Sequence, residues 1–174
     1  DDPDLGVWQA ILGGLTTLDA LAPGRFDERV AAILGPSIDR LGWVPAPDDD
    51  DRTRQLRGLV LAAAGTIGSD GAVVAMARSL WDTTVEDPAV ATAVVAIVAA
   101  HGDAGTYAEC RERARRADTA QVEQRHLRAL TRFPGIDEVT ILLGEMLDGG
   151  IRSQDAPYLL RDALAHRWHR RFVW

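Results

Sequence analysis

Two histidines near the C-terminal end have the spacing most suggestive of metal chemistry. His166 and His169 lie three residues apart, which places both imidazoles on one face of a helix, and neutral imidazole is a common zinc ligand. Three arginines, Arg167, Arg170 and Arg171, crowd the pair and would repel a cation. We therefore expect no metal site in this chain and assign the histidine pair to a solvated or interface role.

An acidic run and a lone cysteine are the other residues with chemical potential. The run Asp48–Asp51 lacks the EF-hand pattern, because Thr53 stands where the loop needs glycine and Leu59 where it needs glutamate. We interpret it as a solvated loop before a helix N-terminus, which favours negative charge. Cys110 lies on an apolar stripe and is expected in the core. No His-Glu-x-x-His, Gly-x-Ser-x-Gly or dinucleotide-binding glycine motif occurs, so the residues themselves predict no catalytic site.

All 19 basic residues are arginine, set against 26 acidic residues, for a net charge of −7 and a pI near 5.0. This balance excludes a general nucleic-acid binder. Two clusters fall on separate expected helices: Arg52, Arg54 and Arg57, and Arg125, Arg128 and Arg132. A guanidinium suits bidentate carboxylate capture. Either these arginines pair with the excess acidic side chains of neighbouring helices, or a few hold a peptide carboxylate.

The elements that position these residues are expected to be helices. With 174 residues and 47% hydrophobic residues, the chain can bury a core without disulfides. Strand signals are missing, and Gly, Pro and Asp punctuation separates about nine helical patterns. Their expected ranges are 4–22, 26–41, 51–67, 71–82, 88–101, 104–117, 119–133, 136–147 and 155–173. The uncharged apolar run Pro88–Ala100 is shorter than the roughly 20 residues of a membrane span, and we expect no membrane partner.

The helix starts repeat at a regular interval. Every second helix begins near residues 51, 87, 118 and 155, which predicts an all-α fold of helical hairpins, an α-α superhelix of the HEAT or armadillo type. An irregular bundle is the alternative. Asp87 before Pro88, and Asp118 with Gln121 three residues later, are predicted to cap two of these helices.

Several segments then resemble a known family. They are Leu41–Trp43 with Thr53–Leu61, His101–Tyr107, Gln124–Leu130 and, most clearly, Gly150–Tyr158 with its Arg-x-Gln-Asp pattern. In order and spacing they resemble the C-terminal helical domain of aminopeptidase N-type zinc metallopeptidases, the gluzincin aminopeptidases, and are similar to the C-terminal domain of the endoplasmic-reticulum aminopeptidase. The resemblance runs from Val7-Trp8 to Val173-Trp174.

The resemblance implies a role within a larger enzyme. The 174 residues would be one C-terminal helical domain, lacking the upstream catalytic domain and both ends of the helical domain. Such a domain is non-catalytic: it covers the active-site cavity and helps to select or hold the peptide. The zinc cofactor belongs to the catalytic domain, so the implied partners are that domain of the same protein and peptide substrates. A bacterial, cytoplasmic location is expected.

The resemblance also nominates residues. Arg132 matches a basic position of the inner face and is the first candidate for a peptide-carboxylate contact, with Arg57 and Tyr107 as weaker ones. Gln154 and Asp155 are expected to cap the last helix. Two other functions stay open: a free-standing HEAT-like scaffold that binds a protein partner, and a metal-dependent enzyme built on the histidine pair.

Overall fold

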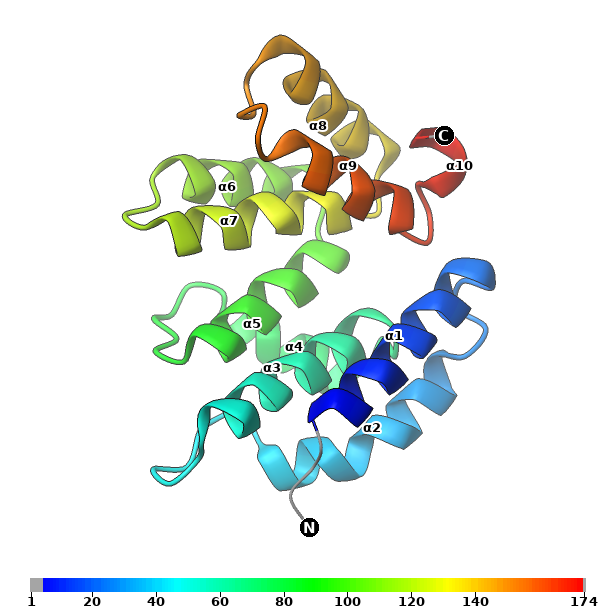
Figure 1. Cartoon of the computed structure of the whole chain (residues 1–174), viewed down its shortest axis with the longest axis vertical. Helices are drawn as coiled ribbons and strands as arrows, with labels where there is room; N and C mark the ends of the chain where they lie inside the picture. The colour runs from blue at the N-terminus through cyan, green and yellow to red at the C-terminus, as the bar shows by residue number, and fades with distance from the viewer. Residues whose placement is uncertain (1–4, 174) are drawn as a thin grey trace. The chain divides into compact units, whose positions relative to one another are not determined.

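The computed structural model describes residues 5–173, in which all regular structure is helical and no strand occurs. This confirms the all-α fold class, and the succession of helices along the chain is that expected of an α-α superhelix (Figure 1). The longer helices of the described range are α1 (Leu5–Leu21), α2 (Asp27–Leu41), α3 (Asp51–Thr66), α4 (Gly71–Leu80), α5 (Pro88–Ala100), α6 (Ala104–Arg115), α7 (Ala120–Ala129), α8 (Ile136–Asp148) and α9 (Ala156–Ala165). A 3₁₀ turn, η1 (Leu130–Arg132), follows α7, and a short helix, α10 (Arg170–Val173), follows α9.

The chain divides into two compact units at the last turn of α5, between Ile97 and Val98. The first unit contains α1 to α4 and most of α5. The second contains the end of α5 and the remaining helices. The predicted first residue of the first helix and the final Trp174 lie outside the described residues.

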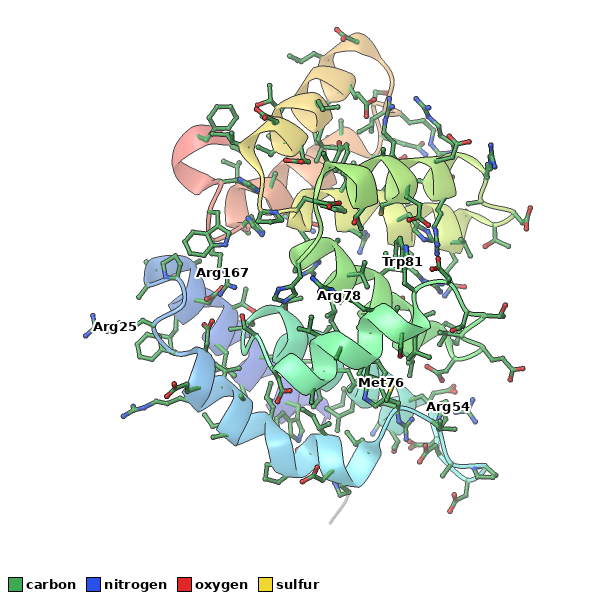
Figure 2. All side chains as sticks on the ribbon, turned by 180° about the vertical axis from the view of Figure 1, so that it is seen from behind. Arg25, Arg54, Met76, Arg78, Trp81 and Arg167 are labelled. Carbon is green, nitrogen blue, oxygen red and sulfur yellow. The ribbon has the colours of Figure 1, made fainter. Side chains whose placement is uncertain are left out.

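The first unit is organised around α3, which contacts α1, α2 and α4 (Figure 1). The α2–α3 contact is made by apolar residues at helical spacing, and both Leu34 and Val60 are fully buried. The solvent side of this unit carries charged side chains such as Arg25 and apolar ones such as Met76 (Figure 2).

Two glycines allow α3 to approach α5 closely. A Cβ atom on Gly58 would lie 2.6 Å from the carbonyl oxygen of Ala89, and one on Gly65 would lie 2.6 Å from the Ile97 side chain. Since real Cβ atoms do not tolerate such distances, the two helices meet through glycine backbone. The apolar α5 is buried at nearly every position from Val90 to Ala99, as its continuous hydrophobicity predicts.

The second unit consists of two helical hairpins. Helices α6 and α7 run side by side, α8 and α9 form the next pair, and α9 also contacts α7 and η1 (Figure 1). The core of this unit includes Cys110, Leu130, Phe133 and Leu142, all at most 1% exposed. Cys110 is therefore a core residue, as its stripe predicts.

The last predicted helix, 155–173, is wrong as a single element. The structure ends α9 at Ala165, and His166 adopts an extended backbone with φ −70° and ψ 133°. The chain turns there, and α10 begins only at Arg170. The turn lets His169 reach the backbone of Phe133, a tertiary contact that local helical periodicity does not encode.

Only one of the four nominated capping residues, Asp87, caps a helix as predicted. Asp87 does accept hydrogen bonds from the backbone N–H groups of Ala89 and Val90, both at 2.9 Å. The N-cap of α7, however, is Thr119 and not Asp118, because the Thr119 hydroxyl accepts from the Val122 N–H at 3.2 Å. Residue preference alone does not decide between Asp118 and Thr119, because Asp and Thr are both favourable N-cap residues.

Asp155 stands at the N-cap position of α9 but makes no side-chain cap bond. Its carboxylate instead pairs with Arg152 at 3.0 Å and accepts a hydrogen bond from the Gln124 amide at 2.9 Å. Arg152 also pairs with Glu123 of α7 at 2.9 Å. The Arg-x-Gln-Asp segment thus fastens the α8–α9 connection to α7, while Gln154 is exposed.

Candidate functional site

The three residues nominated for peptide contact stand on three different elements. Arg57 lies on α3 in the first unit, whereas Tyr107 on α6 and Arg132 on η1 belong to the second. Their environments also differ, since Arg57 and Tyr107 are buried and Arg132 is exposed.

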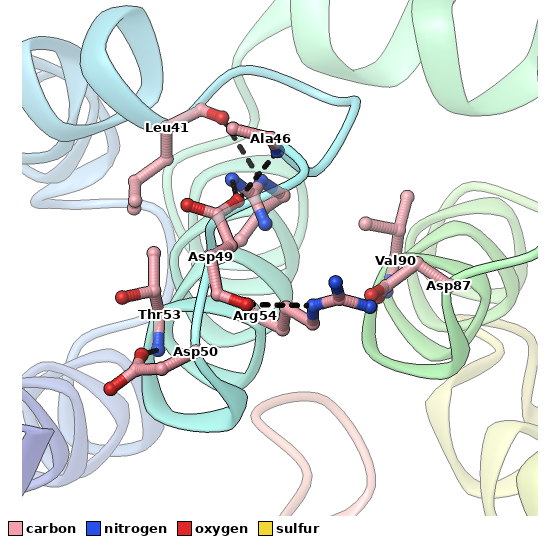
Figure 3. A network of polar contacts seen from close by, with 9 residues as sticks. Leu41, Ala46, Asp49, Asp50, Thr53, Arg54, Asp87 and Val90 are labelled. Carbon is pink, nitrogen blue, oxygen red and sulfur yellow. Dashed lines mark hydrogen bonds and ion pairs between the residues drawn. The ribbon is translucent and has the colours of Figure 1, made fainter.

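Arg57 is enclosed in the fold and 2% exposed. Its Nε atom donates to the Leu41 carbonyl oxygen at 2.9 Å, and its Nη2 atom lies 2.5 Å from Oδ2 of Asp49. The Asp49 carboxylate also accepts a hydrogen bond from the Ala46 N–H at 2.7 Å (Figure 3). The Asp49 backbone carbonyl oxygen accepts one from Nε of Arg54 at 3.2 Å. The guanidinium therefore ties the α2–α3 connection to α3.

The carboxylate in this network is held in its charged form. The hydrogen bond from Arg57, followed by the one from the Ala46 N–H, lowers the pKa of Asp49 below its usual value. Asp50, the next residue, caps α3 by accepting from the Thr53 N–H at 2.7 Å. Within the acidic run, Asp50 thus caps the start of α3, as expected for a loop before a helix N-terminus. Asp49 in addition pairs with the buried Arg57, which the sequence did not predict.

Tyr107 is 4% exposed and packs edge-on against Phe133, with ring centroids 5.1 Å apart and planes at 81°. Burial raises the pKa of its hydroxyl to about 12. The hydroxyl has no hydrogen-bond partner among the described residues. A Cβ atom on Gly102 would lie 2.5 Å from the Phe133 ring, so Phe133 is enclosed from that side as well.

Arg132 is exposed and forms no ion pair with any described residue. It ends η1, and the next residue, Phe133, turns into an extended conformation before Pro134. The Phe133 carbonyl oxygen is held by Nε2 of His169 at 2.5 Å. The backbone on the C-terminal side of Arg132 is therefore anchored. Desolvation of the guanidinium lowers the pKa of Arg132, and the nearby Asp162 carboxylate opposes that shift.

The histidine pair is stacked and does not converge on a common point. The rings of His166 and His169 have centroids 4.4 Å apart and planes at 21°. Burial, then the neighbouring His169 and Arg132, lowers the pKa of His166 to about 3. In the described part of the chain, no group of three or more His, Cys, Asp or Glu side chains could hold a metal ion.

A cavity of about 90 Å³ lies in the second unit between α6, α7 and the α8–α9 connection. Its apolar wall consists of Ala114, Leu127, Leu130 and Ile151. Charged side chains that line the cavity form ion pairs with each other: Arg111 pairs with Glu145, and Arg152 pairs with Glu123. Because these cations already have carboxylate partners, the cavity offers a small anion little net attraction.

Sequence reasoning found the exposed arginine but missed the residues that support it. Phe133, Gly102 and His169 together fix the backbone after Arg132, and they come from segments far apart in the chain. The only local signal was Pro134, which predicts a helix end near Phe133. Within the described range, no single helix is long and apolar enough to cross a membrane; the bent pair α3 and α4 passes that test by length and composition.

The chain matches a protein-family model over its whole length. The family model described as "ERAP1-like C-terminal domain" matches residues 1–174. A comparison with curated proteins returned no match. The family match covers every element described above, including both units.

Proposed function

Because the chain belongs to the ERAP1-like C-terminal domain family, we propose that it is the non-catalytic C-terminal domain of a bacterial zinc-dependent aminopeptidase. In this proposal it covers the active-site cavity and helps to hold the peptide substrate. The full-length family match is the observation that carries the proposal. In this proposal the zinc ion and the hydrolytic chemistry belong to the catalytic domain of the parent enzyme.

Arg132 is the residue proposed to contact the peptide. It is exposed, it lacks an ion-pair partner among the described residues, and its backbone is anchored at Phe133. A guanidinium without an ion-pair partner can form bidentate, charge-assisted hydrogen bonds with a terminal carboxylate. The anchored backbone limits the conformational entropy lost when the carboxylate binds.

Arg57 and Tyr107 enter the proposal as positioning residues. Arg57 has both its Nε and one Nη group committed to Leu41 and Asp49. Tyr107 packs against Phe133, the neighbour of Arg132, and presents no exposed hydroxyl. Their proposed effect on the peptide is therefore indirect: Arg57 holds the α2–α3 connection, and Tyr107 holds the segment that carries Arg132.

The test is made in the parent enzyme with its catalytic domain and zinc in place. The substrates are a peptide of about ten residues, its C-terminally amidated form and a short aminoacyl anilide. Arg132→Ala should raise KM about five- to tenfold for the free-carboxylate peptide and leave the other two substrates unchanged. Arg128→Ala, at an exposed arginine on α7, is the matched control and should change none of them.

Three outcomes would overturn parts of this proposal. An equal loss on free and amidated peptides would show that Arg132 does not bind the carboxylate. An upstream reading frame without His-Glu-x-x-His and a further glutamate ligand would remove the aminopeptidase assignment itself. Zinc-dependent hydrolysis of an aminoacyl anilide by the 174-residue chain alone would contradict the non-catalytic role.

A further inference from the structure

The two histidines that follow α9 are held face to face by a tight turn. The N–H of His169 donates to the carbonyl oxygen of His166 at 3.3 Å, and the imidazole rings have centroids 4.4 Å apart and planes at 21°. His169 is 2% exposed, and the Nδ1 atom of His166 is buried without a hydrogen-bond partner among the described residues. The histidine pair is therefore a largely buried stack at the corner between α9 and α10.

The histidine pair contacts the backbone of the segment that carries Arg132. Nε2 of His169 lies 2.5 Å from the Phe133 carbonyl oxygen, and His166 forms a hydrogen bond with the backbone of Arg132. The elements on either side, α9 and η1, are also in direct contact. Because the regular structure of η1 ends at Arg132, these tertiary contacts, and not a helix, fix the backbone there.

The surroundings of His166 favour a neutral imidazole over a charged one. The titratable groups that act on it are basic: His169 and Arg167 from the turn, and Arg132 from η1. Burial, followed by these neighbours, lowers the pKa of His166 to about 3, although the hydrogen bond with the Arg132 backbone opposes the shift. The carboxylate of Asp162, on α9, acts on Arg132. A proton on His166 is therefore disfavoured as long as the corner is closed.

The corner can open without unfolding the rest of the second unit, because α10 has only four residues and a single turn does not persist by itself in water. In the closed corner, the N–H groups of Phe172 and Val173 donate to the His169 carbonyl oxygen at 2.8 and 2.9 Å. Opening breaks the bond to Phe133 and brings His166 into water, where its pKa returns to about 6.5. The open state binds more protons between the two pKa values, so the closed corner loses stability as the pH falls below about 6.5.

We propose that His166 and His169 are positioning residues for Arg132 and that they make its contact with a peptide carboxylate depend on pH. This inference rests on the proposed function of Arg132. In the closed corner, the pair fixes the backbone at Arg132 and Phe133, so the guanidinium is held in place for the carboxylate. In the open corner that backbone is free, and binding must also restrain it. The equilibrium constant for opening should rise about eightfold between pH 7 and pH 5.5.

Hydrogen exchange on the 174-residue chain tests the opening itself. Relative to the intrinsic exchange rates, the N–H groups of Phe172 and Val173 should lose protection about eightfold between pH 7 and pH 5.5. Urea below about 1 M should leave their protection unchanged but lower that of the Leu142 N–H, which exchanges through unfolding of the core. His166→Gln should reduce the pH effect to less than about twofold, whereas the control His101→Gln, directly after α5, should keep it. Equal urea dependence of the three N–H groups, or a full pH effect in His166→Gln, would overturn the proposal.

The parent enzyme tests the consequence for the carboxylate contact. The readout is the KM of an amidated peptide divided by the KM of the same peptide with a free carboxylate, because this ratio cancels pH effects on the catalytic domain. The carboxylate stays ionised at pH 5.5. In the unaltered enzyme the ratio should fall at least about twofold from pH 7.5 to pH 5.5, and in His166→Gln it should stay constant. His169→Ala should lower it about threefold at pH 7.5 with kcat unchanged, and His169→Gln, whose amide can donate to the Phe133 carbonyl oxygen, should restore it.

Two results separate this inference from the proposed function. A ratio near one that Arg132→Ala does not change would remove the carboxylate contact and this inference with it. A ratio that depends on Arg132, yet is the same at both pH values and in His169→Ala, would leave the carboxylate contact standing and overturn the positioning role of the histidine pair. Where His169→Ala does not fold, the comparison of the unaltered enzyme with His166→Gln decides between the same two results.

Discussion

The Nε2 atom of His169 donates a hydrogen bond to the carbonyl oxygen of Phe133 at 2.5 Å, across 36 residues of sequence. His169 is 2% exposed and Phe133 is 1% exposed, so the bond is shielded from water. It joins the corner between α9 and α10 to the segment that follows η1. Because Phe133 also receives Tyr107 edge-on, the same residue connects three elements of the second unit.

Removing this bond should loosen the second unit. His169→Ala deletes the donor, leaves the Phe133 carbonyl buried without it and opens a cavity, so we expect a loss of about 2–4 kcal/mol in the free energy of unfolding. Urea denaturation followed by circular dichroism measures this. Trp168→Ala, at a neighbouring side chain that is 53% exposed, is the control and should cost about 1 kcal/mol or less.

Acid should destabilise the second unit through His166. Its folded-state pKa is lowered to about 3, mainly by burial, from an unfolded value near 6.5. The unfolded state therefore binds more protons between these values, and stability falls as the pH drops from about 6.5 toward 3. His166→Gln removes the titrating group. A comparison of unfolding free energies at pH 7 and pH 4.5 should show a smaller loss in the variant; equal losses would contradict the assignment.

The Arg57 network predicts an asymmetric response to substitution. Arg57→Ala removes a buried cation together with its bond to the Leu41 carbonyl oxygen, and should cost about 2–4 kcal/mol of stability. Arg54→Ala should cost much less, because Arg54 is only partly buried and donates one bond to the Asp49 carbonyl oxygen. Thermal unfolding of the two variants tests this order. A larger loss for Arg54 would show that the loop is held elsewhere.

The close contact of α3 with α5 should make a small substitution costly. Gly65→Ala would place a Cβ atom 2.6 Å from the Ile97 side chain, and we expect a loss of about 1–3 kcal/mol despite the better helix propensity of alanine. Gly144→Ala in α8 has open space within 4 Å and should stabilise by up to about 1 kcal/mol. Opposite signs in urea denaturation would verify that packing decides the first case.

Cys110 should serve as a reporter of opening. It is fully buried, and burial raises the pKa of its thiol to about 12, so almost no thiolate is present at neutral pH. We expect a thiol-specific reagent to label the native protein only through unfolding. The labelling rate should therefore rise with urea in parallel with the loss of helical signal. Rapid labelling without denaturant would contradict the burial of this residue.

Helix identity was predictable because the signals are local. The apolar periodicity of α8 and the Asp87-Pro88 start of α5 depend on residues within one or two turns, and the structure places both helices near their expected limits. The cap of α7 was displaced by one residue, since Asp118 and Thr119 are both good caps and only the backbone geometry chooses between them.

The roles of the arginines were not predictable by residue type. Arg57 and Arg132 both suit carboxylate capture, yet one is buried against Asp49 and the other is exposed without an ion-pair partner among the described residues. Asp49 precedes α3, which begins at Asp51, so the helical periodicity of α3 does not place its carboxylate against Arg57. Its position depends on the path of the α2–α3 connection.

By itself, the sequence determined the helical class, the hairpin spacing and the family resemblance, because periodicity, caps and motif order are properties of neighbouring residues. Only the tertiary structure decided which cation is enclosed and where the last helix breaks. Those outcomes depend on contacts between segments such as Phe133 and His169, and their distances are set by the packing of whole helices.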